Sequence, residues 1–159
     1  MFEPRNSHSF DHELHGGSTM RMQVHFVNEM TLPVTIQTWE LPPGGSEGMH
    51  AHEPGAGALE EFYLVLEGVA RMQVGAEIHE LCAGDSVLAQ VGVNHDITNV
   101  GTELLRVLVV WGPQGEVDFS AYGSVVAAKA TKGQPSRRTS PGPTPCTDRK
   151  ARLKASVEP

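Results

Sequence analysis

The chain has 159 residues, a length that fits one domain whose core is large enough to fold without disulfide or metal staples. Its formal net charge of −7 is unevenly distributed, because the first 128 residues hold four basic and 17 acidic side chains and the remainder holds eight basic and two acidic ones. The acidic body argues against nucleic acid as a partner, and the lack of an apolar signal sequence or a membrane-length apolar run predicts a cytoplasmic protein without membrane association.

Short strands separated by glycine-rich turns are predicted along most of the chain. Residues 1–20 are polar and unpatterned, and they are predicted to form a leader without regular structure. Apolar and polar residues then alternate over 21–27 and 32–41, as in half-buried strands. Further strands are predicted at 49–52, 61–66, 69–74, 77–82, 86–91, 95–100 and 102–112. Strands at intervals of roughly ten residues are typical of an all-β barrel or sandwich.

The C-terminal segment differs in composition from the rest of the chain. From residue 129 onward it is rich in Pro, Ser, Thr and basic residues and has no amphipathic period. Such a segment buries too little apolar surface to fold alone. The sequence therefore predicts one β domain over residues 21–128 and a disordered basic tail over 129–159.

The stretch GMHAHEPGAGALEEFYLVLEG, residues 48–68, carries candidate metal ligands. On a strand, His50 and His52 share a face because successive side chains point to opposite sides. In the next strand Glu61 shares a face with Tyr63, among apolar neighbours where a carboxylate is costly unless it is paired or bound to a cation. Two imidazoles and a carboxylate that converge from neighbouring strands indicate a metal site.

Two motifs in this region and beyond it resemble those of the cupin family. The first motif, G-x5-H-x-H-x3,4-E-x6-G, is matched by Gly44, His50, His52, Glu61 and Gly68. The second, G-x5-P-x-G-x2-H-x3-N, is matched by Gly84, Gly92, His95 and Asn99. The resemblance covers about residues 20–113. It implies a cupin-type double-stranded β-helix, which is a jelly-roll barrel, with His95 as a further metal ligand.

Two positions depart from the family pattern. Eight residues rather than three or four separate His52 from Glu61, which leaves Glu60 as an alternative ligand. We choose Glu61 for its spacing to Gly68 and because it is in phase with the following strand. Gln90 stands at the usual proline, a position that shapes a turn and supplies no ligand.

One divalent transition metal ion is therefore predicted at His50, His52, Glu61 and His95. Three imidazoles and a carboxylate suit Fe, Mn, Ni, Co, Cu or Zn, whereas Mg and Ca prefer oxygen ligands alone. Four protein ligands leave one or two coordination positions open for a substrate. The alternative interpretation is that the histidines are exposed edge residues and that the carboxylate is solvated.

Other residues are candidates for substrate chemistry. Tyr63 is predicted to point into the barrel and to donate or accept a proton, with a hydrogen-bonded core tyrosine as the alternative. Gln37 and Trp39 share a face of a neighbouring strand and are predicted to line the substrate pocket, although Trp39 also fits a plain core position. The histidines of the leader are expected to be solvated and not to bind metal: His8, His12 and His15.

Three functions fit these residues. The resemblance to cupins implies Fe(II) dioxygenases with this ligand set, and we favour an Fe(II)-dependent oxygenase that acts on a small organic molecule. A non-redox lyase, isomerase or polyketide-type cyclase would use the metal as a Lewis acid and Tyr63 for proton transfer. A metal-containing module that binds a small molecule without turnover is the third. A homodimer is also expected, because edge strands need to be covered and the strand over 21–27 is placed to join a partner's sheet.

Overall fold

The structure is a computed structural model that describes residues 1–132 and Cys146. The chain divides into two compact units, Met1–Gln114 and Gly115–Pro159. The described strands lie in the first unit, and the helix α1 (Gly123–Thr131) lies in the second. Among the described residues, no helix is long and apolar enough to cross a membrane.

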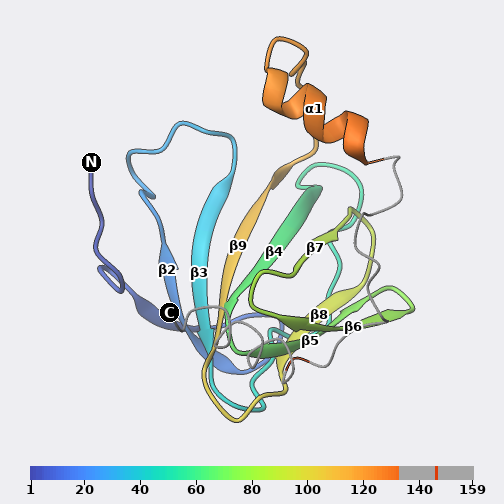
Figure 1. Ribbon diagram of the computed structural model, residues 1–159. Helices are drawn as coiled ribbons and strands as arrows, with labels where there is room; N and C mark the ends of the chain where they lie inside the picture. The colour runs from blue at the N-terminus through green and yellow to red at the C-terminus, as the bar shows by residue number, and fades with distance from the viewer. Residues whose placement is uncertain (133–145, 147–159) are drawn as a thin grey trace, which may run out of the picture. The chain divides into compact units, whose positions relative to one another are not determined.

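The first unit is built from two antiparallel sheets (Figure 1). In order across the larger sheet, its strands are β1 (Phe10–Glu13), β2 (Thr19–Val24), β3 (Thr35–Leu41), β9 (Leu105–Pro113), β4 (Leu59–Glu67) and β7 (Ser86–Ala89). The smaller sheet has the order β6 (Glu77–Cys82), β5 (Val69–Val74) and β8 (His95–Asn99). The predicted all-β, jelly-roll fold is confirmed.

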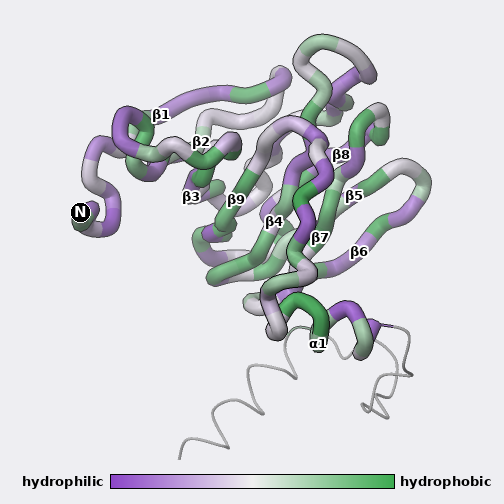
Figure 2. Tube along the Cα trace, turned by 90° about the horizontal axis from the view of Figure 1, so that it is seen from above, coloured by the Kyte–Doolittle hydropathy of each residue, from purple (hydrophilic) through white to green (hydrophobic). Residues whose placement is uncertain are grey.

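The core follows from the alternation of side chains along the central strands. On β4 and β9, Tyr63 pairs with Val109 and Val65 pairs with Val107, and all four side chains are buried. Figure 2 shows a hydrophobic stretch along β9. Full burial of an apolar side chain of this size stabilises a fold by about 1.5–3 kcal/mol, so these strands hold the barrel together.

The N-terminal residues depart from the prediction. Within the predicted leader, β1 pairs with β2 from Phe10 opposite Met22 to Glu13 opposite Thr19, and Met20 is 1% exposed. The pattern could not show this strand because all four residues of β1 are exposed and only Phe10 is apolar. The pairing was decided by the neighbouring strand and not by the hydropathy of β1.

Two other predicted boundaries differ from the structure. Residues 49–52, predicted as a strand, form a loop that touches β8 through a single bridge between His50 and His95. The helix α1 spans the predicted boundary between residues 128 and 129, so the first residues of the predicted tail are helical. The rest of that tail, 133–145 and 147–159, lies outside the described residues.

Candidate metal centre

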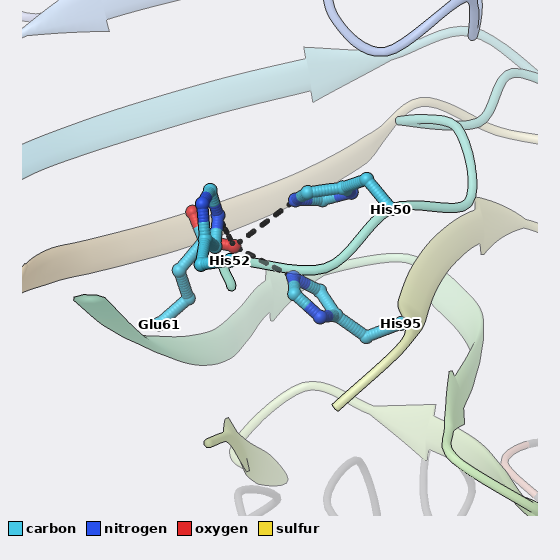
Figure 3. Close-up of side chains that lie close together, drawn as sticks. All are labelled: His50, His52, Glu61 and His95. Atoms are coloured by element: carbon cyan, nitrogen blue, oxygen red, sulfur yellow. Dashed lines mark hydrogen bonds and ion pairs between the residues drawn. The ribbon is translucent and has the colours of Figure 1, made fainter. Parts of the chain in front are cut away.

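Four side chains from three segments converge inside the barrel (Figure 3). Glu61 lies on β4 and His95 begins β8, whereas His50 and His52 lie in the loop between β3 and β4. One ligand atom from each of the four residues lies within 4.8 Å of those of the others. The structure therefore brings together all four residues predicted to bind the metal.

The loop that carries the two neighbouring histidines is fixed by backbone hydrogen bonds. The amide of His50 donates to the carbonyl of His95 at 3.1 Å, and the reverse bond measures 2.8 Å. On either side, the amide of Glu47 donates to the carbonyl of Ile97, and the amide of Gly92 donates to that of His52. The loop thus runs along β8 as an irregular strand, which keeps both imidazoles on the inner side.

The carboxylate of Glu61 is the common neighbour of the three imidazoles. Its Oε2 lies 2.7 Å from Nε2 of His95, 3.1 Å from Nε2 of His52 and 3.4 Å from Nε2 of His50. The Glu61 side chain is 6% exposed and that of His95 is 1% exposed. One buried carboxylate oxygen therefore faces three ring nitrogens.

The hydrogen bonds of the rings test whether this cluster fits a metal. Nδ1 of His50 donates to the carbonyl of Gly48 at 2.9 Å, and Nδ1 of His95 donates to that of Val93 at 2.8 Å. Because a carbonyl only accepts, each neutral ring turns the lone pair of Nε2 toward the cluster. Nε2 of His50 and Nε2 of His52 are buried and have no hydrogen-bond partner. Lone pairs that converge beside a carboxylate need a cation, so the residues fit a divalent metal.

The pKa values show the same demand for positive charge. Burial alone would raise the pKa of Glu61, but His50, His95 and the Tyr63 hydroxyl hold it well below its usual range. Burial alone would lower the pKa of His95, but the hydrogen bond to Glu61 raises it above its ordinary value. A proton on His95 or, in its place, a bound cation therefore supplies the positive charge that the Glu61 carboxylate needs.

Glu60, the alternative ligand, points elsewhere. Its Oε1 accepts a hydrogen bond of 3.0 Å from Nε2 of Gln114 in an exposed position. It does not belong to the cluster of possible metal ligands. Strand alternation on β4 thus places Glu61 inside the barrel and Glu60 outside it.

Tyr63 and Glu47 form a buried acid pair behind the cluster. The Tyr63 hydroxyl lies 2.9 Å from Oε2 of Glu61 and 3.0 Å from Oε2 of Glu47. A phenol has one proton to donate, so both contacts are hydrogen bonds only when Glu47 is itself protonated. Burial and the charge of Glu61 raise the pKa of Glu47 well above its usual range, which favours that protonated form.

Sequence reasoning missed Glu47, whose side chain is fully buried. It lies between Ser46 and Gly48 in the turn before the histidine loop, three positions ahead of His50. An acidic residue in a glycine-rich turn is ordinarily solvated, so the pattern gave no reason to place it inside. The turn packs against β8 on one side and against Gly17 on the other, and a local pattern shows neither contact.

A cavity of about 330 Å³ adjoins the cluster, and both Gln37 and Trp39 line it. Nε1 of Trp39 donates to Oε1 of Gln37 at 2.6 Å, and its ring meets that of Tyr63 edge to face at 6.0 Å. Tyr63 itself is not among the lining residues. The structure thus places the two predicted pocket residues at the cavity and Tyr63 behind it, in contact with Glu61.

Two histidines of the predicted leader also reach the cavity. His12 and His15 line its wall while keeping exposed surface. The ring of His15 stacks on that of His50 at a centroid distance of 3.5 Å and an interplanar angle of 8°. Both side chains are exposed, as expected, but the strand β1 and the residues after it bring them to the cavity wall, which the sequence pattern did not show.

Three imidazoles and one carboxylate converge inside an antiparallel jelly-roll barrel, and together they form a candidate transition-metal site. The family model for the cupin domain matches residues 37–111. An uncharacterised protein of Streptomyces coelicolor is 31% identical over 90 residues, which is 57% of this chain and 78% of that protein. The chain belongs to the cupin family.

Two matches from Thermotoga maritima, one in sequence and one in structure, carry more specific names. One, called an oxalate-binding protein, is 39% identical over 72 residues, which cover 45% of this chain and 55% of that protein. The match thus spans about half the length of that relative. A crystal structure of a predicted oxalate decarboxylase superposes with a TM-score of 0.60 and 26% identity, covering 67% of this chain and 92% of that one.

Proposed function

We propose that this protein is a mononuclear metal-dependent enzyme that acts on a small organic molecule in the barrel cavity. The proposed ligands are His50, His52, Glu61 and His95, the proposed metal is Fe(II), and the proposed reaction is an oxygenation. The observation that carries the proposal is the pair of buried, unpartnered Nε2 atoms of His50 and His52 that face Glu61 beside the cavity.

The chain's own residues prepare the site for this chemistry. When bound, a divalent transition metal supplies positive charge and open positions for a substrate and dioxygen. The carbonyls of Gly48 and Val93 orient two of the imidazoles, which keeps the site preorganised. Tyr63 holds Glu61 by a hydrogen bond from its hydroxyl, and the large apolar side chains of the cavity wall would contact the reacting molecule.

Two other functions have support from particular observations. The buried pair of Glu47 and Tyr63 favours a non-redox lyase, isomerase or cyclase, in which protons move near a Lewis-acidic metal. Similarity to a protein called an oxalate-binding protein favours a binding module without turnover.

One experiment separates the three functions. The metal-free protein is reloaded with Fe(II) or Zn(II) and given single-ring aromatic acids, phenols and short dicarboxylates that include oxalate. Oxygen consumption that depends on the added compound and occurs with Fe(II) but not with Zn(II) supports the oxygenase. Turnover with Zn(II) under nitrogen identifies the non-redox enzyme, and binding without turnover identifies the binding module. Failure to take up any metal contradicts all three.

A further inference from the structure

One wall of the cavity is made by the N-terminal arm, which we define as residues 10–17. Phe10, His12, Leu14 and His15 all line the cavity. Leu14 packs against the hydrophobic core, and β1 pairs with β2 along its whole length. The arm is therefore a built part of the barrel.

A close approach between two glycines fixes the arm against the loop that carries the metal ligands. A Cβ on Gly17 would lie 2.3 Å from the backbone of Glu47, and one on Gly48 would lie 2.4 Å from the carbonyl oxygen of His15. Such distances exclude any side chain at either position. The amide of Ser18 adds a 2.7 Å hydrogen bond to the carbonyl of Ser46. The main chain thus sets the position of His15 beside the metal ligands.

The ring of His15 lies at the inner end of the arm, over His50 and 6.2 Å from the ring of His52. Among the described residues it has no hydrogen-bond partner. Together with Glu47 and His50 it also forms a second group of possible metal ligands. His50, however, has only Nε2 to offer, because Nδ1 is bonded to Gly48, and Nε2 faces Glu61. A separate ion at His15 would compete for that atom, so His15 is better placed to meet a molecule bound at the metal.

The lining of the cavity defines the class of that molecule. No Lys or Arg lines it, and its acidic members are Glu47 and Glu61. Much of the remaining wall is large and apolar: Phe10, Leu14, Met22, Trp39, Leu59 and Trp111. A divalent ion held by Glu61 balances one further negative charge, so a dianion such as oxalate would bring an unbalanced second charge into a cavity that no Lys or Arg lines. The cavity suits a compact molecule with one oxygen-donor head and an apolar, ring-sized body.

We propose that His15 is a substrate-positioning residue, which hydrogen-bonds the metal-bound head group of an aromatic hydroxy or carboxylic acid whose ring lies in the apolar part of the cavity. This inference rests on the proposed metal-dependent function. It extends that function by naming the substrate class and by assigning a role to an arm that lies outside the matched cupin domain, residues 37–111.

The test uses the full-length protein loaded with Co(II), whose visible spectrum reports both metal occupancy and ligand binding. Salicylate and oxalate are the probes. The wild-type protein is expected to bind salicylate more tightly than oxalate. His15→Ala and His15→Phe are both expected to keep full Co(II) content and to weaken salicylate binding by about tenfold or more, the factor for losing a hydrogen bond to a charged group. Phe retains the stacking on His50, so it separates the hydrogen bond from ring packing.

His79→Ala is the matched control, because His79 is an exposed histidine on β6 that pairs with Glu77 and does not line the cavity. It is expected to bind both probes like the wild type. Unchanged salicylate binding in His15→Ala, or full binding in His15→Phe, overturns the positioning role. Loss of Co(II) from His15→Ala also overturns it, by making His15 a ligand. Tighter binding of oxalate than of salicylate overturns the substrate class, whereas a wild-type protein that takes up no Co(II) contradicts the proposed function itself.

Discussion

At the scale of single residues, two backbone carbonyls decide which ring nitrogens face the metal centre. The carbonyls of Gly48 and Val93 each accept a hydrogen bond from Nδ1 of a histidine two positions later in the chain. The Nε2 atoms of His50 and His95 then converge on Glu61 without any side chain having to orient them. Orientation by the main chain costs little conformational entropy, because the backbone there is already ordered by its bonds to β8.

The four proposed ligands should be individually necessary for metal binding. His95→Ala removes one of three imidazoles and leaves Glu61 buried beside two lone pairs, so we expect metal affinity to fall by about 100-fold or more. Metal content of the purified variant, measured by inductively coupled plasma mass spectrometry after dialysis, checks this. Glu60→Gln is the control and should retain the wild-type content, because Glu60 bonds Gln114 outside the cluster. Full stoichiometric metal in His95→Ala would disprove the assignment.

Glu47 should behave as a neutral acid in the metal-free protein. Its pKa is raised by burial and by Glu61, so Glu47→Gln replaces the protonated acid by a group of the same shape. We expect this variant to have an unchanged or higher melting temperature. Glu47→Ala should lower the free energy of unfolding by about 1–3 kcal/mol, because it leaves a buried cavity beside Tyr63. Thermal unfolding in the presence of a chelator measures both, and marked destabilisation by Glu47→Gln would show that the ionised form is the one that the fold requires.

At the scale of elements, the histidine loop depends on two neighbours, β8 on one side and the N-terminal arm on the other. Hydrogen bonds to His95 and Ile97 hold it to β8, and Gly48 packs its backbone against His15. The loop is not flanked by a paired strand on each side. These contacts therefore replace the ladder of hydrogen bonds that would fix a regular strand. A change at Gly48 should therefore disturb the metal site and the arm together.

Gly48→Ala tests this close approach, with Gly57→Ala as a matched control. The two glycines have φ values of 102° and 105°, but a Cβ meets backbone only at Gly48. Both variants should lose about 1 kcal/mol or more from the strained backbone, and Gly48→Ala should lose more because the arm has to move. We expect only Gly48→Ala to lower metal content as well. Equal melting temperatures and equal metal content would show that the approach of arm and loop is unimportant.

At the scale of the whole molecule, we expect the barrel to fold without the metal ion. The buried cluster of apolar side chains, among them Trp39, Leu105 and Val107, extends over both sheets without needing the ion. Removal of metal by a chelator should therefore leave the far-ultraviolet circular dichroism spectrum unchanged. Free metal at 100 times its dissociation constant should stabilise the protein by about 2.7 kcal/mol, seen as a higher melting temperature. A spectrum that collapses on chelation would show that the ion is needed for folding.

The homodimer remains a prediction, but a different strand now supports it. The strand expected to join a partner's sheet, now β2, is paired on both sides by β1 and β3 of its own chain. The open edge beyond it belongs to β1, and we propose that this edge is covered in a homodimer. Light scattering at micromolar concentration should give about twice the chain mass of 17.1 kDa. Substitution of His12 on β1 by proline should shift the protein toward monomer, and a monomeric wild type would contradict the proposal.

The sequence by itself determined the barrel and the set of candidate ligands. Strands such as β2 and β5 carry a period of two in their apolar residues, which reflects a local geometry that each strand obeys independently. The full ligand set of His50, His52, Glu61 and His95 came from the resemblance of two motifs to the cupin family, whereas strand alternation alone brought together His50, His52 and Glu61. The choice of Glu61 over Glu60 rested on its spacing to Gly68 and on its phase with the strand that follows.

Only the tertiary structure decided what surrounds those ligands. β1 has no apolar alternation, and it forms a strand because β2 offers it a partner. Glu47 sits in a polar turn and becomes buried because that turn packs on β8, and His15 reaches the cavity because Gly17 and Gly48 let two backbones touch. Each of these contacts joins residues about thirty or more positions apart, except for β1 and β2, and their energy depends on both partners at once. A local pattern records only one partner, which is why it predicted Gln37 and Trp39 in the cavity wall but not Glu47 or His15.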